Sequence, residues 1–114
     1  MYSNNLSVID SQNHNIISTI DVGKKPEYVK LSPDERSAFV THMESNTVSK
    51  ISIDNFKVVK DISVGKGPHG ITFSADGDLM YVSNMKSNDV SIIDTLTDKV
   101  IDNIAVGREP YQIV

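Results

Sequence analysis

A period of 42 residues runs through the whole chain and constrains its fold more than any other feature. The dipeptide Val22-Gly23 returns as Val64-Gly65 and as Val106-Gly107, so both intervals are 42 residues (64 − 22 = 42 and 106 − 64 = 42). Sliding the sequence by 42 positions without a gap gives 27 identities in the 72 overlapping pairs (114 − 42 = 72). Self-similarity at a fixed period of this size indicates a repeat architecture, in which each copy is one supersecondary unit.

Each copy has the pattern of four short β-strands. In the third copy, runs rich in apolar and β-branched residues lie at 70–74, 79–83, 89–94 and 99–106. Polar, turn-forming segments separate these runs, and Asp76-Gly77 between the first two is a strong hairpin signal. No segment long enough for an α-helix has helical periodicity. The sequence therefore predicts an all-β chain of antiparallel units.

Four strands in a period of this length are typical of a β-propeller blade, a small twisted sheet that buries its faces against neighbouring blades. A parallel β-helix is the alternative repeat fold, but its coils are usually shorter and need no hairpin in every copy. Because 114/42 is about 2.7, we predict a partial β-propeller of about 2.7 four-stranded antiparallel blades, too few to close a ring alone.

The register assigns the strands, named A to D from the propeller axis outward, to one incomplete domain over residues 1–114. Residues 1–24 would form strands C and D of a first blade, and residues 109–114 the innermost strand of a fourth. The second and third blades would span 25–66 and 67–108. The open edges and faces of such a piece predict association with the remaining blades of the same propeller or with other copies of the chain.

Three motifs of the third copy resemble the YVTN-type β-propeller repeat. They are the segments 81–84 (Tyr-Val-Ser-Asn), 87–94 (Ser-Asn-Asp-Val-Ser-Ile-Ile-Asp) and 106–110 (Val-Gly-x-x-Pro). The second copy departs from the pattern, with Phe39 and His42 at the ends of the first motif. The resemblance implies a propeller fold and favours a periplasmic or extracellular location. It implies no single activity, because relatives include haem-binding nitrite reductase propellers, lactone hydrolases and scaffold proteins.

Composition excludes several classes of function. Eleven Lys and Arg residues against fifteen Asp and Glu give a net charge of −4, so the chain lacks the basic footprint of a nucleic-acid binder. The absence of cysteine excludes disulfides, cysteine-metal sites and thiol catalysis. No apolar run is long enough to span a membrane. These exclusions leave an unidentified protein or small molecule as the ligand.

Antiparallel alternation places the loops of each blade on two opposite faces. The B–C loops and the D–A crossings share one face, called the rim here, and the A–B and C–D turns share the other, called the turn face. The resemblance implies that a site would lie at the rim and the axial channel. His69 follows the crossing proline there, and an imidazole can serve as a metal ligand or as a general base near neutral pH. Glu27 and Tyr111 occupy the equivalent positions of the other copies.

Further rim candidates are cationic or could ligate a metal. His42 replaces the asparagine of the YVTN motif, and Lys66 and Arg108 would favour an anionic ligand. No ligand spacing demands a metal, so we predict none. The predicted ligand-binding rim residues are therefore His69, Glu27, Tyr111, His42, Lys66 and Arg108.

Several repeated residues instead indicate structural roles. The segment 65–70 matches G-x-G-x-x-G, but a dinucleotide site needs a helix after this loop, whereas a strand is expected here. Ser49 and Ser91 recur at the same offset, and a nucleophile would not be copied into every blade. Asp94 can accept backbone N–H groups in the following turn. We expect structural roles for Gly23, Gly65, Gly107, Pro26, Pro68, Pro110 and Asp94.

The rim loops predict a binding or scaffold module, because the repeated residues are structural and the rim residues vary between copies. The alternative is a fragment of a haem- or metal-dependent redox propeller of the nitrite reductase type, or of a lactonase-like hydrolase, with its site in the axial channel. No catalytic residue can be assigned, which favours binding over enzymatic activity. No cofactor is predicted, and haem belongs to the alternative alone.

Overall fold

The structure, a computed structural model, describes residues 5–9, 11–22 and 25–106. The regular elements of these residues are ten β-strands, and all of their pairings are antiparallel. No helix of the described part is long and apolar enough to cross a membrane. This arrangement confirms the predicted all-β fold.

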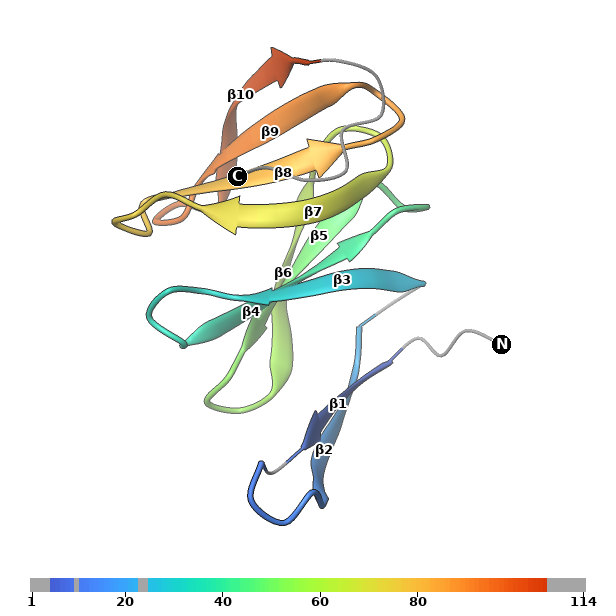
Figure 1. Ribbon diagram of the computed structural model, residues 1–114, viewed down its shortest axis with the longest axis vertical. Helices are drawn as coiled ribbons and strands as arrows, with labels where there is room; N and C mark the ends of the chain where they lie inside the picture. The colour runs from blue at the N-terminus through green and yellow to red at the C-terminus, as the bar shows by residue number, and fades with distance from the viewer. Residues whose placement is uncertain (1–4, 10, 23–24, 107–114) are drawn as a thin grey trace.

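The strands form three sheets in which spatial order follows chain order. Sheet 1 contains β1 (Asn5–Ile9) and β2 (Ile16–Asp21). Sheet 2 contains β3 (Pro26–Leu31), β4 (Ser37–His42), β5 (Thr47–Ser52) and β6 (Lys57–Ser63). Sheet 3 contains β7 (Pro68–Phe73), β8 (Leu79–Asn84), β9 (Asp89–Asp94) and β10 (Lys99–Ala105). The sheets are stacked along the long axis of the molecule like successive propeller blades (Figure 1).

The first strand of sheet 3 begins two residues earlier than expected, at Pro68 instead of position 70. Pro68 pairs with Asn84, and the register then shifts before Ile71 pairs with Val82. Such a bulge tolerates proline, which has no N–H to donate to the ladder. β3 starts in the same way, with Pro26 opposite His42. The two crossing prolines therefore open strands, as a structural role requires.

Strand alternation builds two apolar cores, one on each side of sheet 2. Phe39, Val48 and Ile62 of sheet 2 pack in one cluster with Ile71, Met80, Val82 and Ile93 of sheet 3. The second cluster is formed by Ile20, Val22, Ala38, Val40 and Ile51, with residues of sheet 1 at its edge. Successive residues of β4 thus enter different cores, as the period of two in a strand requires.

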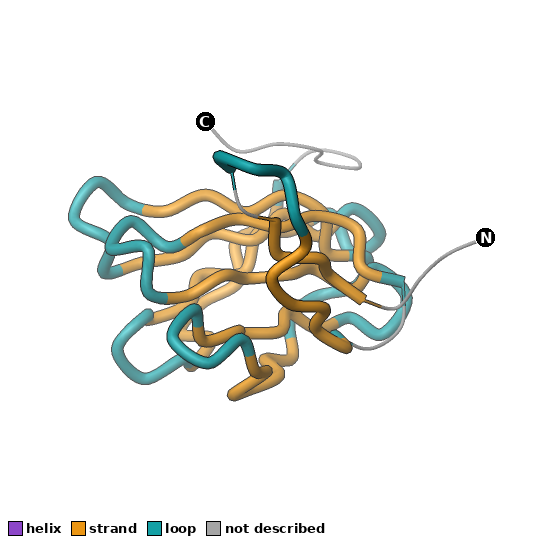
Figure 2. The backbone as a smooth tube through the Cα atoms, turned by 90° about the horizontal axis from the view of Figure 1, so that it is seen from below, coloured by secondary structure: helices purple, strands orange, loops and turns teal. Residues whose placement is uncertain are grey.

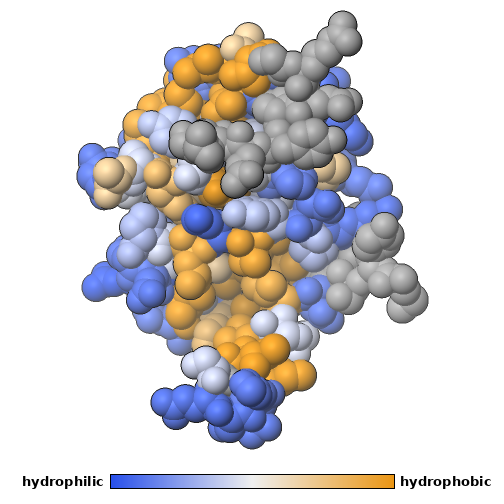
Figure 3. Space-filling model, viewed as in Figure 1, coloured by the Kyte–Doolittle hydropathy of each residue, from blue (hydrophilic) through white to orange (hydrophobic). Residues whose placement is uncertain are grey.

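Strand β3 of sheet 2 and strand β10 of sheet 3 each present apolar side chains to solvent. Ile62 of sheet 2 is 4% exposed, whereas Ile104, its equivalent in sheet 3, is 48% exposed. Val29 of β3 is 46% exposed, whereas its equivalent Ile71 is 5% exposed. Figure 3 shows apolar surface over β3 and the β1–β2 hairpin, and again near β10. The predicted association with further blades or copies would cover these faces.

Most loops gather on two opposite sides of the molecule, at the ends of the strands (Figure 2). Asn46 and Asn88 of the B–C loops have positive φ values of 59° and 54°, a region that asparagine tolerates better than most residues. In the β7–β8 turn Gly77 has a φ of 78°, while the Asp76 carboxylate accepts hydrogen bonds from the Ser74 hydroxyl and the Asp78 N–H. Asp76-Gly77 thus forms the predicted turn, with positive φ at the glycine alone.

Candidate functional site

His69 lies at the rim, in the bulge of β7, where sheets 2 and 3 meet. Its ring stacks on that of Tyr28 from β3, with ring centroids 6.3 Å apart and an interplanar angle of 26°. The Thr41 hydroxyl donates a hydrogen bond to the His69 carbonyl oxygen at 3.1 Å. His69 is therefore fixed from sheet 2 through both its ring and its backbone.

Tyr28 is the partner of His69 that the sequence did not reveal. Its equivalent in the next copy is Gly70, so the repeat alone gives the position no chemical signal. Glu27 lies in the bulge of β3, beside Tyr28, and is exposed. Tyr111 and Arg108 lie outside the described residues, so the predicted convergence of three copies on one channel stays a prediction.

Two lysines face solvent where the β6–β7 crossing meets the β8–β9 loop. The Lys86 N–H donates to the Lys66 carbonyl oxygen at 3.0 Å, and both residues are exposed. Neither ammonium group has an acidic partner among the described residues. Lys25, by contrast, forms an ion pair with Glu44 at 2.9 Å. The sequence pointed to Lys66 and missed Lys86, whose equivalent is Glu44.

His42 lies inside sheet 2 and is only 2% exposed. Its Nε2 is 2.8 Å from the Ser49 hydroxyl, and that hydroxyl donates to Asp61 Oδ1 at 2.6 Å. Because Ser49 gives its proton to Asp61, it accepts from His42, which assigns the imidazole proton to Nε2. A hydrolytic triad needs histidine between serine and aspartate, whereas here serine stands in the middle. This polar triad of sheet 2 is therefore suited to holding strands together.

Sheet 3 contains the same arrangement with different side chains. Asn84 Nδ2 donates to the Ser91 hydroxyl at 2.9 Å, and Ser91 donates to Asn103 Oδ1 at 2.7 Å. Among the described residues, Asn84 Oδ1 has no hydrogen-bond partner. The repeated serine thus has the same hydrogen-bonding position in both sheets. The sequence pointed only to the repetition of the serines; the signal that it offered but that was not used is a hydrogen-bonding side chain at each of the positions 42/84 and 61/103.

The crossing glycines have different physical roles. A Cβ atom on Gly65 would lie 2.6 Å from Asn84 Nδ2 and 2.7 Å from both Asp89 Oδ1 and the Ser87 hydroxyl. Gly67 instead has a φ of 68°. The loop leads into β7, so the G-x-G-x-x-G match opens no helix. Gly23, Gly107 and Pro110 lie outside the described residues.

Asp94 closes β9 as expected. Its Oδ1 accepts the Leu96 N–H at 2.9 Å, which fixes the turn into β10. The described residues contain no group of three or more His, Asp or Glu side chains that could hold a metal ion.

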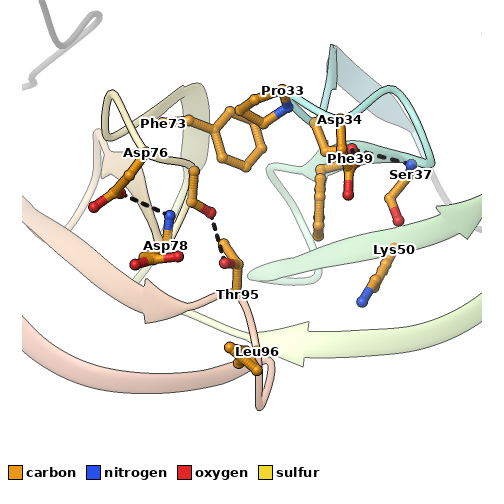
Figure 4. Close-up of a pocket in the computed structure, with 12 residues that line it drawn as sticks. Pro33, Asp34, Ser37, Phe39, Lys50, Phe73, Asp76, Asp78, Thr95 and Leu96 are labelled. Atoms are coloured by element: carbon orange, nitrogen blue, oxygen red, sulfur yellow. Dashed lines mark hydrogen bonds between the residues drawn. The ribbon is translucent and has the colours of Figure 1, made fainter.

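A cavity of about 490 Å³ opens on the turn face between sheets 2 and 3 (Figure 4). The sequence indicated no candidate site on this face. Among its lining residues are Asp34 and Asp76, which lie 42 positions apart in the chain. A hydrogen bond from the Ser32 hydroxyl, followed by one from the Arg36 N–H, lowers the pKa of Asp34. Bonds from the Asp78 N–H and the Ser74 hydroxyl lower the pKa of Asp76.

The chain is similar in structure to several larger proteins. Hydrazine synthase from Kuenenia stuttgartiensis matches with a TM-score of 0.90 and 26% identity, over 96% of this chain and 32% of that one. Apo AztD from Citrobacter koseri matches with a TM-score of 0.81 and 14% identity, over 96% and 31%. The dihydro-heme d1 dehydrogenase NirN, in complex with DHE, gives a TM-score of 0.81 and 18% identity, over 96% and 26%.

The chain thus spans about a third of the length of hydrazine synthase and of AztD, and about a quarter of the length of NirN. No curated protein matches it. The family model described as YNCE-like beta-propeller matches residues 29–114, which include all of sheet 3 and nearly all of sheet 2. With its repeat, its three stacked sheets and this match, the chain belongs to the YNCE-like β-propeller family.

Proposed function

We propose that this propeller segment is a binding module and that its rim binds an anionic ligand at the junction of sheets 2 and 3. The observation that carries the proposal is the stacked pair of Tyr28 and His69, which joins the two sheets at this junction. Aromatic rings at a partly exposed position offer a flat apolar surface with polar edges.

The local charge supports an anion. Lys66 and Lys86 stand beside each other on the rim of a chain whose net charge is −4. Neither ammonium group has an acidic partner among the described residues, so both are available to attract an anionic ligand. A planar carboxylate would combine contact with the ring pair and attraction to the ammonium groups.

The pattern of variation also supports binding at the rim. The polar triads keep a serine at their centre in both sheets, whereas His69 is replaced by Glu27 and Lys86 by Glu44 in the preceding copy. A scaffold that keeps its internal bonds while its loop residues change is the usual basis of a binding surface. The redox and hydrolase alternatives, and the periplasmic or extracellular location, rest on the family resemblance alone.

Titration of the full chain with 1-naphthoate, followed by amide chemical shifts, tests the proposal. We expect saturable shifts at Tyr28, Lys66, His69 and Lys86. The double variant Lys66→Gln/Lys86→Gln should weaken binding about tenfold, since each ammonium contributes up to about 0.7 kcal/mol.

The matched control is Lys57→Gln/Lys99→Gln, which removes the same charge from the starts of β6 and β10 and should leave the affinity unchanged. Equal weakening in both double variants, or shifts confined to the turn face, would contradict the proposal. Titration with haemin distinguishes the redox alternative from this proposal. The alternative predicts that the chain gives a Soret band with haemin and that His69→Ala abolishes this band.

A further inference from the structure

The cavity on the turn face is formed by three turns, which connect β3 to β4, β7 to β8, and β9 to β10. Its volume of about 490 Å³ lies within the range of small-molecule sites, about 300 to 1,000 Å³. The cavity lies on the face opposite the rim, so a ligand bound here would be independent of the proposed rim site.

Two phenylalanines form the apolar wall of the cavity. Phe39 is 2% exposed and Phe73 is partly buried, and their rings are 5.7 Å apart between centroids at an angle of 57°. The turns of the two sheets also approach each other, since a Cβ atom added to Gly77 would lie 3.4 Å from Pro33 Cγ. An apolar group of a ligand can therefore rest on aromatic carbon between the sheets.

The charged lining is acidic. Asp34, Asp76 and Asp78 contribute carboxylates, and Lys50 contributes the only lining cation within the described residues. The Lys50 ammonium is already engaged by Asp98, at 2.9 and 3.2 Å from its two carboxylate oxygens. Figure 4 places Asp76 and Asp78 on one side of the cavity, and Asp34 and Lys50 on the other, with the phenylalanines between them.

The carboxylates keep acceptor capacity for a ligand. Asp34 and Asp76 each use Oδ1 for a serine hydroxyl and a backbone N–H. Their Oδ2 atoms accept no hydrogen bond from the described residues. The same internal bonds lower the pKa of both groups, so both stay ionised in mildly acidic solution.

The walls are held in place by hydrogen bonds of the β9–β10 turn. The Thr95 hydroxyl donates to the Gly77 carbonyl oxygen at 2.7 Å, and the Thr95 N–H donates to the Asp78 carbonyl oxygen at 3.0 Å. A site that is already organised before binding loses less entropy when it takes up a ligand.

We propose that this cavity binds a small organic ammonium ion that carries an apolar or aromatic group. The ammonium group donates to the free carboxylate oxygens of Asp34, Asp76 or Asp78, and the apolar group packs on Phe73, whose ring rests against the buried Phe39. Ionised carboxylates repel an anion, and the aromatic wall offers a metal ion no ligand. A hollow of this volume suits a small molecule better than a folded partner.

Three related probes test the charge preference on the unmodified full chain. Phenethylammonium, 2-phenylethanol and 3-phenylpropionate share an aromatic body and differ in charge. We expect calorimetry to detect saturable binding of the ammonium compound, at least about fivefold tighter than the alcohol, and no binding of the carboxylate. Equal binding of the ammonium compound and the alcohol, or no binding of the ammonium compound, would overturn the proposal. This series requires no variant to fold.

Isosteric variants test the place of binding. Asp76→Asn and Asp78→Asn should each weaken the binding of phenethylammonium about three- to tenfold. Asparagine at position 76 keeps a side-chain oxygen that can accept the hydrogen bonds of the turn. Asp54→Asn is the matched control, because Asp54 is exposed in the β5–β6 turn and does not line the cavity. Equal loss in all three variants would overturn the assignment. Amide chemical-shift changes caused by phenethylammonium should be confined to residues of the turn face. A negative result here therefore leaves the proposed rim site untouched.

Discussion

Sheets 2 and 3 have the same strand order and related sequences, but they differ in how they are buried. Sheet 2 packs against a sheet on each side, and sheet 3 packs against sheet 2 alone within the described residues. They also differ in their polar triads, which are His42–Ser49–Asp61 and Asn84–Ser91–Asn103. The comparison separates what the repeat needs, a central serine with two partners, from what it leaves free.

The largest expected difference concerns equivalent isoleucines on the outer strands. Ile62→Ala removes a side chain that is 4% exposed and should cost about 3 kcal/mol in the free energy of unfolding. Ile104→Ala removes one that is 48% exposed and should cost about 1 kcal/mol. Urea unfolding of both variants measures the two values. Equal costs in a monomeric sample would mean that burial does not distinguish the sheets.

The crossing between the sheets gives the next effect. Gly65→Ala places a methyl group within 2.7 Å of three polar atoms of sheet 3 and its β8–β9 loop, and should destabilise the chain by about 2 kcal/mol. Gly77→Ala is the matched control, because its φ of 78° causes strain while space is available, and about 1 kcal/mol is expected. A larger loss at Gly77 in thermal unfolding would show that backbone conformation dominates over close approach.

The polar triads should differ in their dependence on serine. Ser49→Ala removes the hydroxyl that links the buried His42 Nε2 to the Asp61 carboxylate and should cost about 2 kcal/mol. Ser91→Ala should cost about 1 kcal/mol, because Asn84 Nδ2 also donates to Asp89 at 2.9 Å. Ser63→Ala, at an exposed position in β6, is the control and should be neutral. Identical losses for Ser49 and Ser91 would remove the distinction drawn between the two triads.

The smallest expected effect concerns the equivalent aspartates of the A–B turns in sheets 2 and 3. Asp34 and Asp76 have pKa values lowered from their ordinary value of 3.8, mainly by bonds from the Ser32 hydroxyl and the Asp78 N–H respectively. Since the folded pKa is the lower one, their contribution to stability is complete above about pH 4 and is lost as the pH falls through the folded values. Urea unfolding at about pH 6 and about pH 3 should therefore show a smaller acid-induced loss for Asp34→Asn and for Asp76→Asn than for the wild type. Unchanged acid sensitivity in either variant would contradict the assignment.

The fold was predictable because the repeat imposes the same strand pattern in each copy. The structure of β8, β9 and β10 agrees with the expected strands to within a residue at each end. Position within the repeat also identified His69 as a residue at the rim. Partners that cross between sheets were not predictable, because Tyr28 and Lys86 occupy positions whose equivalents, Gly70 and Glu44, have different chemistry.

His42 illustrates a second limit of sequence reasoning. A histidine at the end of a strand has the same one-dimensional pattern whether its ring faces solvent or the interior. Its hydrogen bonds involve Ser49 of β5 and Asp61 of β6, the next two strands of the sheet, and these contacts depend on strand register. The turn-face cavity was missed for a similar reason, since it requires turns from two sheets at once.

The crossing from β6 to β7 has a consequence for how the chain unfolds. Gly67 N–H donates to Asn46 Oδ1 of sheet 2, while Lys66 N–H donates to the Ser87 hydroxyl of the β8–β9 loop. One short segment is thus held from both sides, so opening either sheet breaks bonds that the other needs. In a repeat protein such nearest-neighbour coupling sets cooperativity. Native-state hydrogen exchange of these two amides should therefore report a single opening shared by both sheets, instead of fraying from one end.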